Sequence, residues 1–268
     1  MIRYMLVLLM LITQIGNNSY AQQDLSEIHC KHFFNGCPLG TPPSNDLIIR
    51  DIYALSSNDN TKFADWVAYR LTPDMLEGTT KTRNWKADPW LEDKETLEPN
   101  DYNDIGQSGY DRGHQAPLAD FKGCSGWEET NFLSNITPQN KDLNQGAWLK
   151  LEDFERNLTK KYGLIYVITG PYYNQESNKI ETIIEPHKLP AGYWKIIAIP
   201  QKNKYFIALS FIFGQTTKRN DIYTNHVTTI NNIEKITGLN FFSELEDKLE
   251  ENLENTKSFD WIMNYIKK

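Results

Sequence analysis

The sequence predicts a mixed α+β fold in a single domain. Three observations lead to this prediction: strand-like runs precede one segment with helical periodicity, more strand-like runs follow it, and no internal repeat or long low-complexity linker divides the chain. Strands that do not alternate regularly with helices are typical of α+β proteins. Hydrophobic residues make up 40% of the 268 positions, which is enough for the core of one such domain.

The N-terminal residues indicate an export signal. Arg3 supplies a positive charge before a nearly unbroken apolar run over residues 4–12, and Ser19-Tyr20-Ala21 places small residues at −3 and −1 of a cleavage site. The apolar run is far shorter than the roughly 20 residues that span a bilayer. We therefore expect residues 1–21 to be a signal peptide, and residues 22–268 to form a secreted or periplasmic protein without membrane attachment.

The first half of the mature chain predicts two strands and a long loop. The strands are expected at 47–53 and 66–71, which are rich in β-branched and aromatic residues. Residues 88–109 are rich in Pro, Asp, Asn and Gly and predict an irregular connection. Loops of this length in compact domains are often functional.

A helix is expected from Asp142 to Lys160, followed by three strands and a helical tail. The apolar residues of the helix recur at spacings that place them on one face, and they are Leu143, Ala147, Leu151, Phe154 and Leu158. The strands are expected at 164–169, 193–199 and 205–212, and the two that are nearly all apolar should be central. From Asn225 onward the chain is expected to be helical, with one face formed by Ile230, Ile233 and Ile236.

The three cysteines allow one disulfide. Cys30 and Cys37 are close in sequence and flank a loop containing Asn35-Gly36, so we expect them to pair in an exported protein. Cys124 lies far from both and is expected to be a buried thiol. None of the cysteine spacings resembles a zinc site.

The charge of the chain does not by itself indicate a partner. There are 28 basic and 35 acidic residues, a formal net charge of −7, whereas proteins that bind only through phosphate neutralisation usually have a basic surface. An enzyme needs only a local positive groove. The densest basic and aromatic cluster is Lys81–Lys86, for which a solvated loop with one anchoring tryptophan is the alternative interpretation.

The segment Asp111-Arg112-Gly113-His114 has two interpretations. A single histidine beside an arginine is most often a core or surface residue with ordinary partners. In the functional interpretation, Gly113 lets the backbone approach a substrate closely, Arg112 binds an anion and His114 acts as a base. Histidine suits that role because its ordinary pKa of roughly 6.5 leaves it mostly neutral at pH 7.

A polar stripe runs beside the apolar face of the expected helix. Its members recur every four residues and are Asn144, Trp148, Glu152 and Arg156. Such a stripe can line a cleft, and the alternative is a Glu–Arg pair on the surface. Asn144 and Trp148 fit a cleft better than a solvated surface.

Together these segments resemble the DNA/RNA non-specific endonuclease family, which are ββα-metal (His-Me finger) nucleases. The resemblance rests on residues 111–114 (Asp-Arg-Gly-His), 135–139 (Asn-Ile-Thr-Pro-Gln) and 143–148 (Leu-Asn-Gln-Gly-Ala-Trp), and runs from about Cys37 to Gly238. It implies a central antiparallel sheet with a ββα-metal active-site motif. Residues 239–268 match poorly and are expected to form an acidic helical extension.

The resemblance also implies chemical roles. His114 corresponds to the general base, Asn144 to the single side chain that binds Mg²⁺ directly (with Mn²⁺ as the alternative metal), and Glu152 to a carboxylate that holds the metal's water. Phosphate-contacting arginines correspond to Arg83, Arg112 and Arg156, and Asn135 to a residue that fixes the imidazole.

The implied reaction is hydrolysis of phosphodiester bonds in DNA and RNA to 5′-phosphate and 3′-hydroxyl ends. A neutral His114 is required, so activity is expected to rise from about pH 6 to 8. The alternatives are a phosphodiesterase for smaller phosphate substrates and a nucleic-acid-binding module without catalysis. A homodimer and a complex with a protein inhibitor are open as assemblies.

Overall fold

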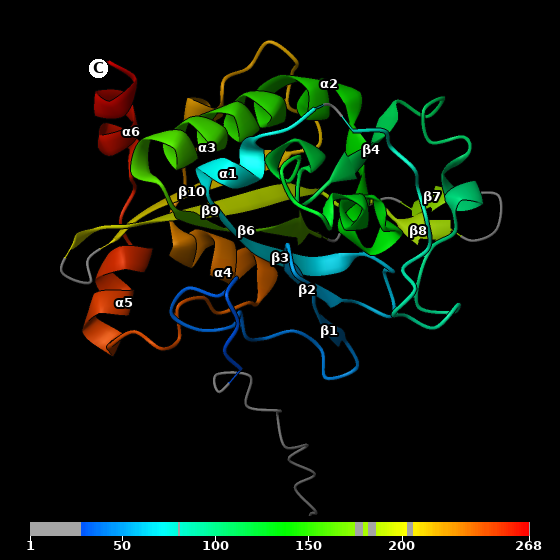
Figure 1. Ribbon diagram of the computed structural model, residues 1–268, viewed down its shortest axis with the longest axis horizontal. Helices are drawn as coiled ribbons and strands as arrows, with labels where there is room; N and C mark the ends of the chain where they lie inside the picture. The colour runs from blue at the N-terminus through cyan, green and yellow to red at the C-terminus, as the bar shows by residue number, and fades with distance from the viewer. Residues whose placement is uncertain (1–27, 80, 175–178, 182–185, 203–205, 268) are drawn as a thin grey trace, which may run out of the picture.

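The centre of the molecule is a six-stranded antiparallel sheet in the order β1-β2-β3-β6-β9-β10 (Figure 1). This computed structural model describes residues 28–267 apart from 80, 175–178, 182–185 and 203–205, so the expected signal peptide lies outside the described residues. The strands are β1 (Asp46–Ile49), β2 (Ala54–Ser57), β3 (Ala64–Leu71), β6 (Ile165–Tyr172), β9 (Gly192–Pro200) and β10 (Phe206–Gly214). Every neighbouring pair is antiparallel, which confirms the α+β class and the central antiparallel sheet.

The remaining elements surround this sheet. The helices are α1 (Pro73–Leu76), α2 (Lys141–Leu143), α3 (Leu149–Tyr162), α4 (Ile230–Thr237), α5 (Asp247–Glu254) and α6 (Phe259–Ile266). Two further strand pairs are β4 (Tyr110–His114) with β5 (Ile136–Asn140) and β7 (Lys179–Glu181) with β8 (Pro186–Lys188). Within the described part of the chain, no helix is long and apolar enough to cross a membrane.

Four of the expected strands are confirmed, and the strand expected at 47–53 is divided. Ile49 of β1 pairs with Ala54 of β2, and the Arg50 amide donates to the Tyr53 carbonyl at 2.8 Å, which closes a tight turn between them. The sequence did not predict this turn, because its residues Ile52 and Tyr53 are apolar and buried, as strand residues are.

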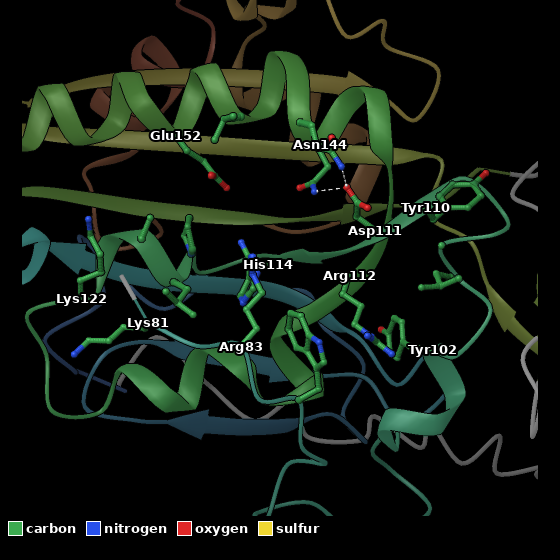
Figure 2. A pocket seen from close by; sticks show the side chains of 18 of the residues that line it. Lys81, Arg83, Tyr102, Tyr110, Asp111, Arg112, His114, Lys122, Asn144 and Glu152 are labelled. Atoms are coloured by element: carbon green, nitrogen blue, oxygen red, sulfur yellow. Dashed lines mark hydrogen bonds between the residues drawn. The ribbon is translucent and has the colours of Figure 1, made fainter. Parts of the chain in front are cut away.

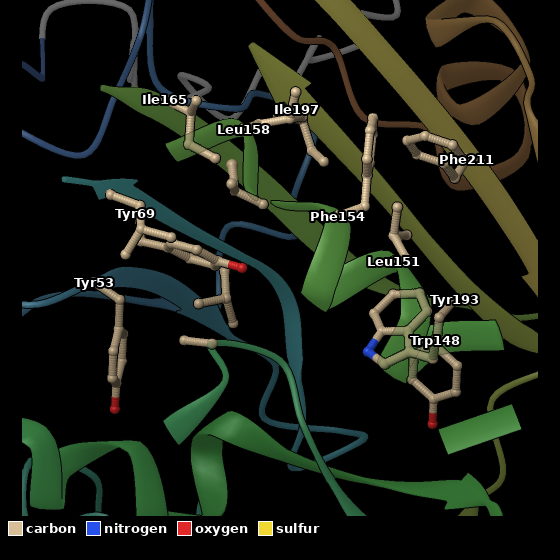
Figure 3. Close-up of a cluster of buried hydrophobic side chains, with 14 of the residues drawn as sticks. Tyr53, Tyr69, Trp148, Leu151, Phe154, Leu158, Ile165, Tyr193, Ile197 and Phe211 are labelled. Atoms are coloured by element: carbon tan, nitrogen blue, oxygen red, sulfur yellow. The ribbon is translucent and has the colours of Figure 1, made fainter. Parts of the chain in front are cut away.

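Helix α3 lies across one face of the sheet (Figures 1 and 3). Its buried residues Leu151, Phe154 and Leu158 pack in one cluster with residues of β3, β9 and β10, among them Tyr69, Ile197 and Phe211. Burying a side chain of this size stabilises the fold by about 1.5–3 kcal/mol. The expected helical face is confirmed. Trp148, which was expected to belong to the polar stripe beside it, is instead buried in the same hydrophobic cluster and does not line a cleft.

The expected helix is not regular at its start. Between α2 and α3 the chain forms one wider π-helical turn, η6 (Asn144–Trp148). Such turns are frequent at functional sites because they redirect side chains within a helix. Here the turn contains the first residue of the polar stripe, Asn144.

The opposite face of the sheet is covered by α4 and by segments near both ends of the described chain (Figure 1). Strand residues alternate between the two faces, so Trp66 and Ala68 of β3 belong to this second cluster, with Ile230 and Ile233 of α4. Ile236 of the expected helical face is instead 39% exposed.

The C-terminal segment is helical, as expected, and packs into the core. Phe241 and Phe242 are buried in the cluster below the sheet, and Ile262 of α6 is fully buried in the cluster that includes α3. Residues 239–268 therefore contribute to both hydrophobic clusters and do not stand apart as an appendage.

The expected Cys30–Cys37 disulfide is not formed, because both residues are free thiols. They share one cluster, in which Cys37 is fully buried and Cys30 is half-buried. Burial raises the pKa of the Cys37 thiol to about 12, and the neighbouring Cys30 adds to this shift. The thiol is thus held in its neutral form. Cys124 is also a free thiol and is half-buried.

Candidate active site

Two short strands outside the central sheet carry the motif residues. In the antiparallel pair of β4 and β5, His114 lies opposite Ile136 and Gly113 opposite Thr137. A Cβ atom on Gly113 would lie 2.7 Å from Gln139 Cβ, which cannot move without its backbone, so this close approach requires glycine. The sequence did not predict either strand, because β4 is mostly polar and β5 contains Pro138. Helix α2 follows β5 directly, giving a strand–strand–helix unit.

This unit borders a pocket of about 780 Å³ (Figure 2). Six of the seven expected site residues line it: Arg83, Arg112, His114, Asn144, Glu152 and Arg156. The long 88–109 loop, whose irregular course is confirmed, contributes Tyr102 to one wall. Five lysines and arginines line the pocket against two carboxylates, so this acidic chain has the local positive site that binding an anion requires.

His114 is held in its neutral form. Burial lowers the pKa of its imidazole to about 4, the positive charge of Arg83 lowers it further, and the polar side chain of Asn131 acts in the opposite direction. Its ring lies beside Trp85, with 5.2 Å between ring centroids. An imidazole with this pKa is already neutral at pH 6, so a rise in activity between pH 6 and 8 would need another titrating group.

Asn135 does not line the pocket, and it fixes the backbone that follows His114. Its side chain accepts a hydrogen bond from the Ala116 amide at 2.8 Å and donates to the Ala116 and Thr130 carbonyls at 3.0 and 2.9 Å. Its own carbonyl accepts from the Gln115 amide at 3.0 Å. Asn135 is fully buried, so it can act on the imidazole only through the chain.

The side-chain amide of Asn144 is oriented by Asp111. Asn144 Nδ2 donates to Asp111 Oδ2 at 2.9 Å, and Gln145 Nε2 donates to the same oxygen at 2.7 Å. An ionised carboxylate only accepts hydrogen bonds, so the amide nitrogen faces Asp111 and the amide oxygen is left for the pocket (Figure 2). The sequence motif contained Asp111 but did not reveal this function, which depends on a contact between β4 and the helix.

Glu152 is a half-buried carboxylate on the pocket wall. Burial raises its pKa to about 7, and the positive charges of Lys195 and Arg156 oppose that shift. Glu152 lies two helical turns after Asn144, as the polar stripe predicted. The Glu152 carboxylate and the Asn144 amide therefore line the same pocket. Glu152 therefore changes its charge in the neutral range of pH.

The three arginines differ in whether carboxylates already engage their guanidinium groups. Arg156 Nη1 donates to Asp120 Oδ1 at 2.7 Å and Nη2 to Asp153 Oδ1 at 2.6 Å, so two carboxylates already engage it. Arg112 lies 5.5 Å from the ring centroid of Trp85, and its Nη2 donates to a loop carbonyl. Arg83 is exposed. In the described part of the chain neither Arg83 nor Arg112 forms an ion pair, so both can bind an anion. The buried Asp120 gave no signal in the sequence.

Comparisons with known proteins identify the family of the chain. A model of the family described as DNA/RNA non-specific endonuclease matches residues 35–248. The chain is 44% identical over 226 residues to a nuclease of Serratia marcescens, covering 82% of this chain and 83% of that protein. It is 30% identical over 262 residues to the mitochondrial nuclease of Saccharomyces cerevisiae, covering 87% and 78%.

A solved structure shares the fold. The crystal structure of the EndoG/EndoGI complex, described as showing the mechanism of EndoG inhibition, matches with a TM-score of 0.69 at 25% identity, covering 78% of this chain and 90% of that one. The family model covers most of the chain, and the Serratia relative matches it over a similar length. This chain belongs to the DNA/RNA non-specific endonuclease family.

Proposed function

We propose that the chain is a Mg²⁺-dependent endonuclease that hydrolyses phosphodiester bonds of DNA and RNA with little sequence preference. The observation that carries the proposal is the convergence of three features in one pocket: the neutral imidazole of His114, the oriented amide oxygen of Asn144 and the unpaired guanidinium groups of Arg83 and Arg112. The relatives that match most of the chain are named nucleases, which supports the same function.

A hard divalent cation fits the oxygen atoms of this pocket. Asn144 would hold it directly, because the bond from Nδ2 to Asp111 leaves Oδ1 free, and Glu152 would hold its water. Among the described residues no group of three His, Cys, Asp or Glu side chains could hold a metal. Mg²⁺ tolerates such a site because it keeps several waters, and Mn²⁺ has similar ligand preferences. When bound, the cation would supply positive charge to the scissile phosphate and the leaving 3′-oxygen.

The side chains of the protein divide the remaining work. His114 accepts a proton from the attacking water, which its neutral imidazole can do throughout the range above about pH 5. Asn135 keeps the imidazole in place through the backbone at Gln115 and Ala116. Glu152 accepts hydrogen bonds from water once it is ionised. The products are a 5′-phosphate and a 3′-hydroxyl end.

The arginines account for the broad specificity. The planar guanidinium groups of Arg83 and Arg112 can each donate two hydrogen bonds to a phosphate. Contacts to phosphate fix the position of a nucleic acid but carry no sequence information. Arg156 does not bind phosphate directly, because Asp120 and Asp153 already engage its donors, and it contributes through its positive charge, which opposes the rise in the pKa of Glu152.

Export, dimerisation and inhibition belong to the same proposal. We retain cleavage after Ala21 and a secreted or periplasmic destination on the sequence of residues 1–21. The yeast relative is named a mitochondrial nuclease, so cell fractionation of the full-length chain is needed to locate this one.

The similar solved structure is a complex with an inhibitor of EndoG, which supports a protein inhibitor as a partner. A homodimer is the proposed assembly, and light scattering tests it.

A cleavage assay on three substrates tests the proposed function. Supercoiled plasmid, single-stranded RNA and bis(p-nitrophenyl) phosphate are incubated with the purified protein in Mg²⁺ or in EDTA. The proposal predicts nicked and linear plasmid and shortened RNA in Mg²⁺, and no cleavage in EDTA. Cleavage of the small ester alone would indicate a phosphodiesterase, and binding of plasmid without cleavage would indicate a binding module.

A further inference from the structure

Two lysines line the same pocket without a role in the reaction described above. Lys81 follows α1 in the chain and Lys122 follows the short helix η3 (Leu118–Asp120). Both side chains are half-buried. In Figure 2 they lie on one side of His114, whereas Arg112 and Tyr102 lie on the other side. The positive charge of the pocket therefore extends beyond the arginines.

The backbone next to Lys122 packs against α1, the helix that precedes Lys81 in the chain. The Gly123 amide, next to Lys122, donates to the Met75 carbonyl of α1 at 2.9 Å. A Cβ atom on Gly123 would lie 2.2 Å from the Asp74 carbonyl oxygen, so only glycine permits this approach. Helix α1 and the segment of Lys122 are thus fixed relative to one another by main-chain contacts.

Neither ammonium group is neutralised within the described residues. No ion pair or hydrogen bond is formed there by Lys81 Nζ or Lys122 Nζ, and Lys81 Nζ lies 5.1 Å from the ring centroid of Trp127. Arg156 in the same pocket is, by contrast, paired with Asp120 and Asp153. Two unpaired cations in a partly enclosed pocket create a positive potential that favours an anion.

We propose that Lys81 and Lys122 form a second phosphate subsite, which binds the phosphodiester next to the scissile one on the same strand. The inference rests on the proposed function and adds a preference for substrate length. Ammonium groups suit such a contact because they hold a phosphate as point charges, without reading the base. A substrate with a single phosphodiester cannot reach this subsite, whereas a longer strand occupies it together with the site at His114.

The test compares two substrates and two sets of variants. The double variant Lys81→Met/Lys122→Met is assayed on a dinucleotide with one phosphodiester and on a single-stranded oligonucleotide of about 12 nucleotides. Loss of a phosphate contact is expected to lower kcat/KM about tenfold on the oligonucleotide. The dinucleotide should be cleaved within about twofold of the wild-type rate. Lys86→Met is the matched control, because Lys86 is exposed in the same segment and does not line the pocket.

Binding in EDTA gives a second readout that does not depend on catalysis. The slope of log Kd against log salt concentration for the oligonucleotide should become shallower by about 0.7 in the double variant, the value expected when one phosphate contact of a single strand is lost. Lys86→Met should leave the slope unchanged. Equal losses on both substrates, or no loss on the oligonucleotide and no change in slope, would overturn the subsite.

The outcomes separate the subsite from the proposed function. If the wild-type protein cleaves neither substrate, the proposed function fails, and the salt slope in EDTA still decides whether the lysines bind phosphate. If the wild-type protein cleaves both and the double variant equals it, the subsite alone fails. Lys81→Arg/Lys122→Arg keeps both charges and should restore the preference for the oligonucleotide, which a variant acting through misfolding would not show. Thermal unfolding of all variants checks their folding.

Discussion

Asp111 Oδ2 accepts a hydrogen bond of 2.9 Å from Asn144 Nδ2, and this bond determines which end of the Asn144 amide faces the pocket. Asp111 lies on β4, three residues before His114, and Asn144 lies in the π-helical turn after α2. The bond therefore links the strand that carries the base to the turn that carries the expected metal ligand. The Asp111 carboxylate itself lines the pocket, and by accepting this bond it turns the amide oxygen of Asn144 away from itself.

Asp111→Asn should weaken metal binding. An asparagine can present a donor as well as an acceptor to Asn144, so the amide oxygen is no longer fixed towards the pocket. Loss of a partner that orients a metal ligand typically costs about 10–100-fold in metal affinity or activity. The Mg²⁺ concentration for half-maximal cleavage measures the effect. Gln145→Ala is the control, because it removes the second donor to Asp111 and the acceptor of Arg219 Nη2 but leaves the bond between Asn144 and Asp111. A wild-type Mg²⁺ titration for Asp111→Asn would refute the orienting role.

Asn144→Ala should lower the rate of cleavage and raise the Mg²⁺ requirement together. It removes the amide oxygen that is proposed to hold the cation, while α3 and its buried face remain. Asn144→Asp keeps an oxygen at the same place and should retain more activity than the alanine variant. Cleavage rates at a series of Mg²⁺ concentrations provide the measurement. If Asn144→Ala has a normal metal titration curve, Asn144 is not the ligand.

The pH dependence should be governed by Glu152 near neutrality and by His114 only in acid. The pKa of Glu152 is raised to about 7, so its carboxylate form is gained as the pH rises from 6 to 8, and kcat/KM should rise with it. His114 has its pKa lowered to about 4, so it gains a proton and loses its function as a base only as the pH falls towards that value. Glu152→Gln should cleave more slowly and give a flat profile between pH 6 and 8. The same rise in that variant would assign the titration to another group.

The ion pair of Lys195 and Glu155 should be important for stability. Both side chains are fully buried, Lys195 Nζ donates to Glu155 Oε2 at 2.6 Å, and Tyr69 Oη donates to the other carboxylate oxygen at 2.7 Å. Lys195→Met leaves the carboxylate without a cationic partner and should lower the free energy of unfolding by about 3–5 kcal/mol. Urea denaturation measures this loss.

A double variant isolates the pair from its packing. Lys195→Met/Glu155→Leu replaces both charges by apolar groups and should recover a large part of the loss, because buried ion pairs are seldom better than apolar contacts of similar volume. A single variant Lys195→Met with nearly wild-type stability would show that the carboxylate is not confined to an apolar environment.

The sequence predicted the parts of the fold that depend on local pattern. The apolar run at 193–199 became strand β9, which lies between β6 and the edge strand β10 and not at the centre of the sheet, and the periodicity of 142–160 became the buried face of α3. The pattern failed where the structure depends on distant contacts. Strand β4 is polar and is defined by its pairing with β5, and the turn at 50–53 is filled by buried residues.

The sequence predicted most of the residues that line the site, but it did not predict the hydrogen bonds between them. The resemblance named His114, Asn144 and Glu152, and the pocket brings them together. It did not indicate that Asp111 orients Asn144, or that Asp120 engages Arg156, because each contact joins residues more than 30 positions apart. The lowered pKa of His114 also depends on burial that a single sequence does not reveal.

Cleavage and binding by His114→Ala test the central claim most directly. The variant removes the proposed base and leaves the arginines, Asn144 and Glu152 in place, so it should bind an oligonucleotide in EDTA with nearly wild-type affinity. Its cleavage of plasmid and RNA in saturating Mg²⁺ should fall by at least about 100-fold, the lower range for loss of a general base. Cleavage within a few fold of the wild-type rate, with binding intact, would contradict the assignment of His114 as the base.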